Sequence, residues 1–91
     1  MFDIAARFGD NLVSCRRLAD MSQDELSIRA SVHRTEISQL ERGLRIPRID
    51  TLAKLCASLE VEPHELMAGI IWRPADVRHG CFGGTGDDGD R

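Results

Sequence analysis

Two short segments of this sequence constrain its fold more than any other feature. The first, Ser22-Gln23-Asp24-Glu25-Leu26, has a serine followed three positions later by a glutamate, the capping-box pattern of a helix N-terminus. The second, Ile37-Ser38-Gln39-Leu40-Glu41-Arg42-Gly43, ends at a glycine, a residue that commonly terminates helices. The spacing predicts helices over residues 22–30 and 34–41, joined by a tight turn at residues 31–33.

Helical periodicity continues through the rest of residues 1–72, and no segment alternates between polar and apolar residues as a strand would. A first helix is predicted over about residues 3–19 and a fourth after the loop 44–47. A fifth should begin at Pro63, a residue favoured in the first turn of a helix, and extend as far as Trp72. The predicted fold class is therefore all-α, a compact five-helix bundle. Its core is expected to include Phe8, Leu12, Cys15, Val32, Ile37, Leu40, Leu52, Leu55, Cys56, Leu59 and Leu66.

The composition changes at about residue 73. Residues 73–91 hold five of the eight glycines of the chain, together with several aspartates and few apolar residues. Such a segment buries too little apolar surface to offset the entropy that is lost when it is ordered. We therefore expect two parts, a helix-turn-helix domain at residues 1–72 and a flexible Gly/Asp-rich tail at residues 73–91.

Several classes of protein are not expected. The chain of 91 residues has no apolar run near the roughly 20 residues that cross a bilayer, and its N-terminus lacks a signal-peptide pattern. Three widely spaced cysteines do not suggest a disulfide framework, so the cytoplasm is the expected compartment. No cofactor and no metal site is predicted, because His79 and Cys81 alone cannot supply the four ligands of a stable zinc site. No nucleophile stands beside a base, so the chain is not expected to be an enzyme.

The outward face of the third predicted helix, residues 34–41, suggests a function. Two short helices joined by a tight turn form a helix-turn-helix, whose second helix enters the major groove of DNA. Arginine can hold guanine, and glutamine adenine, with two hydrogen bonds each. Glu36 could select cytosine or offset the charge of Arg34, and ordinary solvated residues are the alternative for the whole face. With Ile37 and Leu40 turned inward, the candidate base-reading residues are Arg34, Thr35, Ser38 and Gln39.

The net charge of −3 is unusual for a DNA-binding protein, but the positive charges are concentrated in one region. Residues 29–48 hold five arginines against two glutamates, a local excess of three positive charges. A basic face of this kind can bind phosphates on a molecule that is acidic overall. Arg42, Arg45 and Arg48 are therefore expected to contact DNA phosphates, although a solvated run of charges would have the same sequence pattern.

The residues described so far occur together in one known family. The sequence resembles the phage-repressor type of helix-turn-helix domain, the family of Cro, lambda repressor and the xenobiotic-response-element regulators. The resemblance covers about residues 6–67 and implies a five-helix fold that binds operator DNA, usually as a two-fold dimer. The matching residues are Phe8, Leu12, Arg16, Ser22, Gln23, Leu26, Ile37, Ser38, Leu40, Glu41, Arg42, Gly43, Pro47, Leu52, Leu59 and Leu66.

The resemblance also implies roles for three individual residues. Gln23, at the start of the predicted helix over residues 22–30, is expected to contact a phosphate. Arg16 and Glu41 are expected to form a salt bridge between the first helix and the end of the third. The sequence departs from the family pattern at Ser31, where glycine is usual, and at His33, where a serine or threonine usually caps the third helix.

Residues 66–72 are more apolar than one small core can absorb. Exposed apolar patches of this kind tend to mark interfaces. Ile70, Ile71 and Trp72 are therefore expected to form a homodimer contact. The alternative is that they fold back over the N-terminal part of the first helix.

Together, these patterns predict a sequence-specific transcriptional regulator that binds double-stranded DNA with its third helix in the major groove. Neither a membrane nor a small-molecule substrate is expected as a partner. Two alternatives remain open. One is a protein-interaction module with the same fold, and the other is the DNA-binding antitoxin of a toxin–antitoxin pair.

Overall fold

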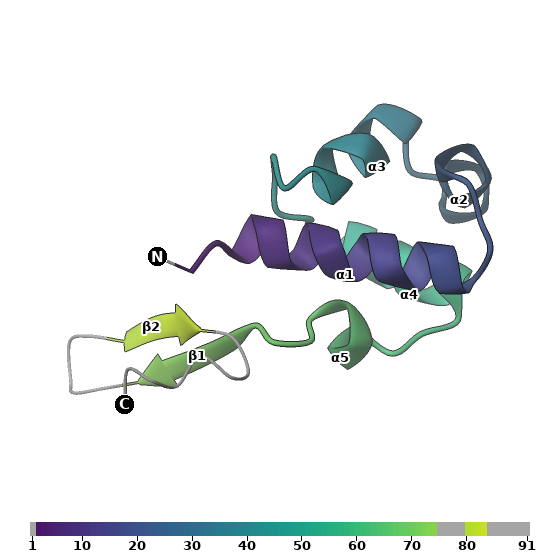
Figure 1. The fold of residues 1–91 in the computed structure, drawn as a ribbon. Helices are drawn as coiled ribbons and strands as arrows, with labels where there is room; N and C mark the ends of the chain where they lie inside the picture. Colours follow the sequence, from purple (N-terminus) through teal and green to yellow (C-terminus); the bar gives the residue numbers. More distant parts are fainter. Residues whose placement is uncertain (1, 75–79, 84–91) are drawn as a thin grey trace.

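Five helices and one short β-hairpin make up the computed structural model, which describes residues 2–74 and 80–83 (Figure 1). The five helices confirm the predicted helical fold, and the hairpin is an addition to it. The elements follow in the order α1 (Ile4–Leu18), α2 (Gln23–Ala30), α3 (Arg34–Glu41), α4 (Ile49–Leu59), α5 (Pro63–Leu66), β1 (Ile71–Pro74) and β2 (Gly80–Gly83).

Helix α1 is the element around which the others are arranged. It packs against α3 and α5, while α4 packs against α2 and α5. Figure 1 shows α2 and α3 on one side of α1, with α5 and the hairpin on the opposite side. Cys15 and Leu52, both expected in the core, are only partly buried and pack against it. The buried core consists of Phe8, Leu12, Leu26, Ala30, Val32, Ile37, Leu40, Leu55, Cys56, Leu59 and Leu66.

The turn between α2 and α3 contains a residue in the left-handed backbone conformation, which glycine would adopt with less strain. Ser31 takes φ 54° and ψ 43°, the left-handed region, which costs a non-glycine residue about 1–2 kcal/mol. Val32 follows it and is buried, so the turn is anchored in the core. His33 caps α3, because its Nδ1 accepts a hydrogen bond from the backbone N–H of Thr35 at 3.1 Å. The two departures from the family pattern are thus accommodated within the expected turn.

Gly9 allows α1 and α3 to approach each other closely. A Cβ atom added at this buried position would lie 2.6 Å from the carbonyl oxygen of Leu40 and 2.7 Å from that of Glu41. Both oxygens belong to the backbone of α3, which cannot move aside as a flexible side chain could. The C-terminal end of α3 is therefore positioned by direct contact with α1.

Helix α5 is shorter than predicted, because it ends at Leu66 and does not reach Trp72. The side-chain amide of Asn11, on α1, donates hydrogen bonds to the carbonyl oxygens of Leu66 at 2.8 Å and Ala68 at 2.9 Å. A continuing helix would use these two carbonyls for backbone N–H groups four residues later. Gly69 then takes φ +83°, in the left-handed region, and the helical path stops.

The residues that follow form an antiparallel hairpin. Strand β1 pairs with β2 in a register that places Trp72 opposite Phe82, and the two rings meet edge to face with centroids 5.1 Å apart. The ring of Trp72 also covers Gly80, since a Cβ added there would overlap the indole. Gly80, which pairs with Pro74, therefore leaves room for the indole ring to lie against β2.

The hairpin changes the predicted division of the chain. Strand β1 crosses the boundary that was expected between residues 72 and 73, and residues 73–74 and 80–83 are strand residues. Residues 75–79 and 84–91 of the predicted tail lie outside the described residues. Each strand has only four residues, which is too few for an alternating pattern to be recognised in the sequence.

We expect Gly9→Ala to lower the free energy of unfolding by about 1–3 kcal/mol, because the new methyl group would press on the backbone of α3. Urea denaturation followed by circular dichroism would measure the change. Ser14→Ala is a suitable control, because Ser14 is exposed on the same helix and its replacement should change stability by less than about 0.5 kcal/mol. Equal stability of the two variants would contradict the close contact of α1 with α3.

Candidate nucleic-acid interface

A network of hydrogen bonds around Glu41 connects α1, α2 and α3. Arg16 holds the carboxylate with two bonds, from Nε to Oε2 at 2.5 Å and from Nη2 to Oε1 at 3.1 Å. The Gln23 side chain donates a third, from Nε2 to Oε1 at 2.9 Å. Arg16 Nη1 also donates to the carbonyl oxygen of Met21 at 2.8 Å. The ion pair that the resemblance implies is therefore present, and Gln23 is part of it.

The network is shielded from water. The side chains of Arg16 and Glu41 are 13% and 5% exposed. Hydrogen bonding to Glu41 raises the pKa of the Arg16 guanidinium, so Arg16 keeps its positive charge. Because one carboxylate binds side chains from two other helices, the end of α3 and the start of α2 are held at one fixed position relative to α1.

The outward face of α3 carries the predicted base-reading residues. Ile37 and Leu40 are fully buried and fix the rotation of the helix. Arg34 and Thr35 are exposed in its first turn. Ser38 and Gln39 are half-buried at the edges of this face. The structure thus brings all four candidate base-reading residues to one side of a short helix that α1 positions from behind.

Arg34 and Arg48 have acidic partners on the same surface. Arg34 Nε lies 2.6 Å from Asp24 Oδ1, and this pair connects α3 with α2. Arg48 Nε lies 3.4 Å from Asp50 Oδ1. Both pairs are largely exposed, so each contributes at most about 1 kcal/mol and can open readily when a phosphate or base competes.

Arg45 has a different set of contacts from the one expected of a phosphate-binding residue. Its Nη1 donates to Gln39 Oε1 at 3.1 Å, and its Nη2 lies 4.0 Å from Glu36 Oε2. The carboxylate of Glu36 is therefore paired with Arg45, whereas Arg34 is paired with Asp24. Sequence reasoning did not identify Asp24 as a partner of Arg34, because only the turn between α2 and α3 brings the two residues together.

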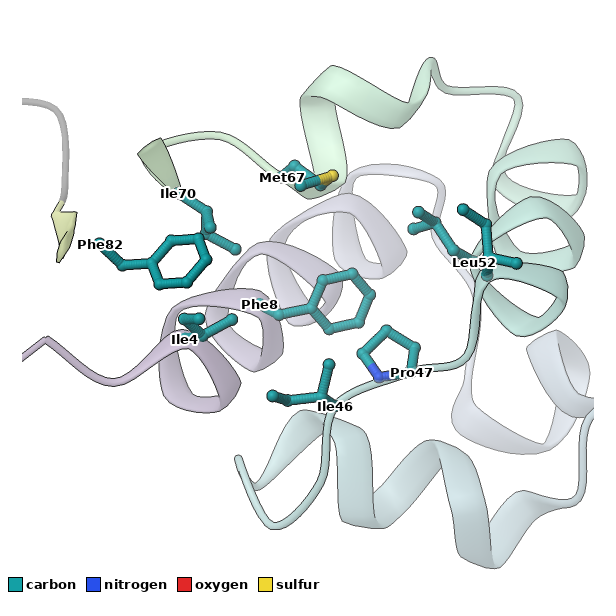
Figure 2. Close-up of a pocket in the computed structure, with 9 residues that line it drawn as sticks. Ile4, Phe8, Ile46, Pro47, Leu52, Met67, Ile70 and Phe82 are labelled. Atoms are coloured by element: carbon teal, nitrogen blue, oxygen red, sulfur yellow. The ribbon is translucent and has the colours of Figure 1, made fainter. Parts of the chain in front are cut away.

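An apolar groove lies between α1 and the loop before α4 (Figure 2). It has a volume of about 310 Å³ and its lining is almost entirely apolar. Figure 2 shows side chains from α1, from the loop before α4, from the segment after α5 and from β2 converging on it. The lining residues are Ile4, Phe8, Ile46, Pro47, Ile49, Leu52, Met67, Ile70 and Phe82.

The three residues predicted at a dimer interface have different environments. Ile70 is partly buried, packs against the core and lines the groove together with Ile4. Ile71 and Trp72 are 42% and 52% exposed on β1. Ile70 therefore follows the alternative in which the segment folds back over α1, whereas Ile71 and Trp72 remain available at the surface.

The cysteines are not arranged as a reactive or metal-binding site. Cys15 is half-buried and Cys56 is buried, and burial raises the pKa of both thiols, which keeps them protonated. Cys81 is exposed on β2, and His79 lies outside the described residues. Among the described residues there is no group of three His, Cys, Asp or Glu side chains that could hold a metal ion. Within the same residues, none of the helices is long and apolar enough to cross a membrane.

Comparison with known proteins defines the class to which this arrangement belongs. The model of a helix-turn-helix family, HTH_3, matches residues 12–66, which is more than half of the chain. The protein belongs to this helix-turn-helix family. The match begins in α1 and ends with α5, so it contains the Arg16–Glu41 ion pair and all of α2 and α3 but not the hairpin.

Individual proteins show the same relationship. The chain is 39% identical over 49 residues to the control protein C.BamHI of Bacillus amyloliquefaciens, which covers 54% of this chain and 60% of that protein. It is 34% identical over 76 residues to an uncharacterized HTH-type transcriptional regulator, y4dJ, of Sinorhizobium fredii (strain NBRC 101917 / NGR234), covering 84% and 99%. The crystal structure of the restriction-modification controller protein C.AhdI from Aeromonas hydrophila superimposes with a TM-score of 0.68 and 29% identity, covering 71% of this chain and 98% of that one.

These relationships identify the protein as a DNA-binding transcriptional regulator. The family is a non-enzymatic class. The chain spans 60% of the control protein C.BamHI but nearly the whole of the regulator y4dJ. C.AhdI is matched over almost its full length by only 71% of this chain.

Removing one partner of the Arg16–Glu41 pair should be strongly destabilising. We expect Arg16→Met to lower the free energy of unfolding by about 3–5 kcal/mol, because the carboxylate of Glu41 would remain buried without its main partner. Thermal and urea denaturation would measure the loss. Arg17→Met is the control, since Arg17 is exposed and its replacement should cost less than about 0.5 kcal/mol.

The double variant Arg16→Met/Glu41→Leu tests the cause of that loss. It should recover part of the stability, because no unpaired charge would then be left in the interior. Additive losses from the two changes would instead show that packing, and not the buried charge, is responsible.

Proposed function

We propose that this regulator reads a specific sequence in double-stranded DNA with α3 in the major groove. The observation that carries the proposal is the orientation of α3. Its apolar residues Ile37 and Leu40 are fully buried, so Arg34, Thr35 and Gln39 lie together on the solvent side of a helix held from behind by α1. A short helix presented in this way is the recognition element of helix-turn-helix proteins.

Each base-reading residue has chemistry suited to a base edge. The exposed guanidinium of Arg34 can donate two hydrogen bonds to guanine O6 and N7. Thr35 offers a methyl group to thymine and a hydroxyl group to a base or phosphate. The hydroxyl of Ser38 and the amide of Gln39, nearer the C-terminal end of α3, would contact the bases that follow.

Phosphate contacts would position the helix. We assign them to Gln23, Arg42 and Arg48, with Arg45 contributing its charge. Gln23 is the first residue of α2, where backbone N–H groups are unpaired, and its amide is oriented by Glu41. Most positioning contacts in protein–DNA complexes come from such amide, guanidinium and backbone groups. Because each phosphate contact releases counterions from the DNA, binding should weaken with salt, and Asp24 and Asp50 must give up Arg34 and Arg48 for these arginines to bind.

The operator is proposed to be bound by a homodimer. Ile71 and Trp72 stay exposed on β1, and Phe82 of the neighbouring strand is 42% exposed beside the apolar groove. Water is excluded from such a surface most simply by a second copy of the chain. Two α3 helices related by a two-fold axis would then read half-sites about one helical turn apart.

The proposal requires no cofactor, substrate or catalytic group, and it places the protein in the cytoplasm with the DNA that it regulates. The likeness to C.AhdI favours genes of a restriction–modification system as the regulated target. Sequences selected from a random DNA pool would test this target, because they should occur upstream of such genes in the source genome.

Two alanine substitutions can distinguish base-reading residues from residues that contact phosphates. Arg34→Ala should cost about 1–3 kcal/mol on the preferred operator and relax the preference at one base position. Arg42→Ala should weaken binding to all sequences about equally and reduce the salt slope by roughly one unit. Fluorescence anisotropy on the operator, on its single-base variants and on random duplex would measure both effects.

Two outcomes would contradict the proposal. Equal affinity of the unmodified protein for operator and random duplex would show that it does not read sequence, and binding to neither duplex would favour the protein-interaction module with the same fold. Identical changes for Arg34→Ala and Arg42→Ala on every duplex would show that α3 does not read bases through Arg34.

The dimer is tested through its exposed apolar residues. Ile71→Asp should abolish association and tight operator binding while the monomer stays helical, because a carboxylate cannot be buried unpaired. Sedimentation velocity would measure association, and the emission of Trp72 should shift to the blue as the protein concentration rises. Leu18→Asp is the matched control, since Leu18 is 88% exposed at the end of α1 and does not line the groove. A monomeric protein with a concentration-independent spectrum would rule the dimer out.

A further inference from the structure

The side chains of Arg45 and Gln39 form one hydrogen-bonded unit on the DNA-facing surface, and this unit has a consequence for base choice. We propose that Arg45 is a specificity-determining residue, which directs Gln39 toward the acceptor-rich edge of guanine and away from adenine. This inference rests on the proposed function, because it concerns the sequence that α3 reads.

The geometry fixes Arg45 beside Gln39 through both the backbone and the side chains. The backbone carbonyl of Gln39 accepts a hydrogen bond from the N–H of Leu44 at 2.9 Å, so the loop after α3 turns back over this residue. Gly43 makes the reversal possible with φ +73°. The next residue along the chain, Arg45, then donates from Nη1 to Gln39 Oε1 at 3.1 Å.

Glu36 holds the other side of the guanidinium. Its Oε2 lies 4.0 Å from Arg45 Nη2, and the Glu36 side chain is 25% exposed. Glu36 and Gln39 are three positions apart on α3 and therefore lie on the same face of the helix. Arg45 is thus held between two side chains of α3, and its guanidinium is directed at that helix.

Hydrogen-bond chemistry determines what this unit can read. Arginine only donates, so the amide atom that faces Arg45 must be the oxygen of Gln39. A two-bond contact with adenine needs that same oxygen to accept from adenine N6, while Nε2 donates to N7. With the oxygen paired to a cation, the unit presents mainly N–H groups and a positive charge, which would face the N6 amino group of adenine unfavourably.

Guanine has the complementary pattern. Its O6 and N7 are both acceptors in the major groove, and they can accept from Nε2 of Gln39, whose oxygen is held by Arg45. If Arg45 were absent, the amide of Gln39 would be free to turn and form the two-bond contact with adenine. With Arg45 present, Gln39 should therefore prefer guanine to adenine, whereas Gln39 without Arg45 should prefer adenine.

The test uses the full chain and a preferred operator selected from random duplex DNA. Gln39→Ala identifies the base pair that Gln39 reads, as the position where the four bases become equivalent. Affinities are then measured for duplexes that carry guanine or adenine at that position. The unmodified protein should prefer guanine by about tenfold, and Arg45→Met should move the ratio toward adenine by about tenfold or more.

Two comparisons isolate the effect from simple loss of charge. Arg42→Met removes the same charge from an exposed residue near the end of α3 and should leave the guanine-to-adenine ratio unchanged while weakening both duplexes. In the Gln39→Ala background, Arg45→Met should weaken all four bases equally, because its influence on base choice acts through Gln39. Helical content and thermal midpoint should stay the same in both arginine variants, since both residues are exposed.

The possible failures are distinguishable. If Arg45→Met changes the guanine-to-adenine ratio by less than about threefold, or toward guanine, Arg45 is only a phosphate contact and the inference is overturned while the proposed function stands. If Gln39→Ala equalises no position but Arg34→Ala still relaxes one, the inference also fails alone. If the unmodified protein does not distinguish any operator from random duplex, the proposed function fails together with it.

Discussion

The position of α3 depends on one buried carboxylate. Glu41 receives two hydrogen bonds from Arg16 and one from Gln23, so that α1, α2 and α3 meet at a single group that is 5% exposed. Buried ion pairs often add little net stability, because removing two charges from water costs nearly as much as their attraction returns. Their geometry is nevertheless strict, and here that geometry fixes α3 against α1. Gly9 reinforces it, because the backbones of α1 and α3 touch where a side chain would separate them.

The surface in front of this framework is charged in both signs. Arg34 pairs with Asp24, Arg48 with Asp50, and Arg45 with Glu36 and Gln39. The arginines of this surface are thus partly neutralised by neighbouring carboxylates in a chain whose net charge is −3. Exposed pairs are weak enough to be exchanged for phosphates or bases. They also orient long, flexible side chains before DNA arrives, which lowers the entropy lost on binding.

The hairpin lies on the other side of α1, away from α2 and α3 (Figure 1), and its strand β2 contributes Phe82 to the apolar groove. The family match ends at residue 66, before β1 begins. The groove joins Ile46 and Pro47, in the loop just after Arg45, to Phe82 of β2. A homodimer that forms through this region would therefore contact the same loop that places Arg45 beside Gln39. Dimer formation could then affect the base preference proposed for Gln39.

Local sequence signals determined the helix-turn-helix itself. Three of these signals act within a few residues of their own position: a capping serine at the start of α2, a buried Val32 in the turn and a glycine after α3. The inward orientation of Ile37 and Leu40 follows from the helical period. The end of α5 was not encoded in this way, because it depends on Asn11, which is 55 residues away from Leu66 in the chain. The partners of Arg34 and Arg45, and the pairing of Trp72 with Phe82, likewise arise only when distant or looped-back segments come together. The sequence alone therefore specified which residues lie on the outward face of α3, whereas the tertiary structure decided which of their atoms are paired with neighbouring side chains.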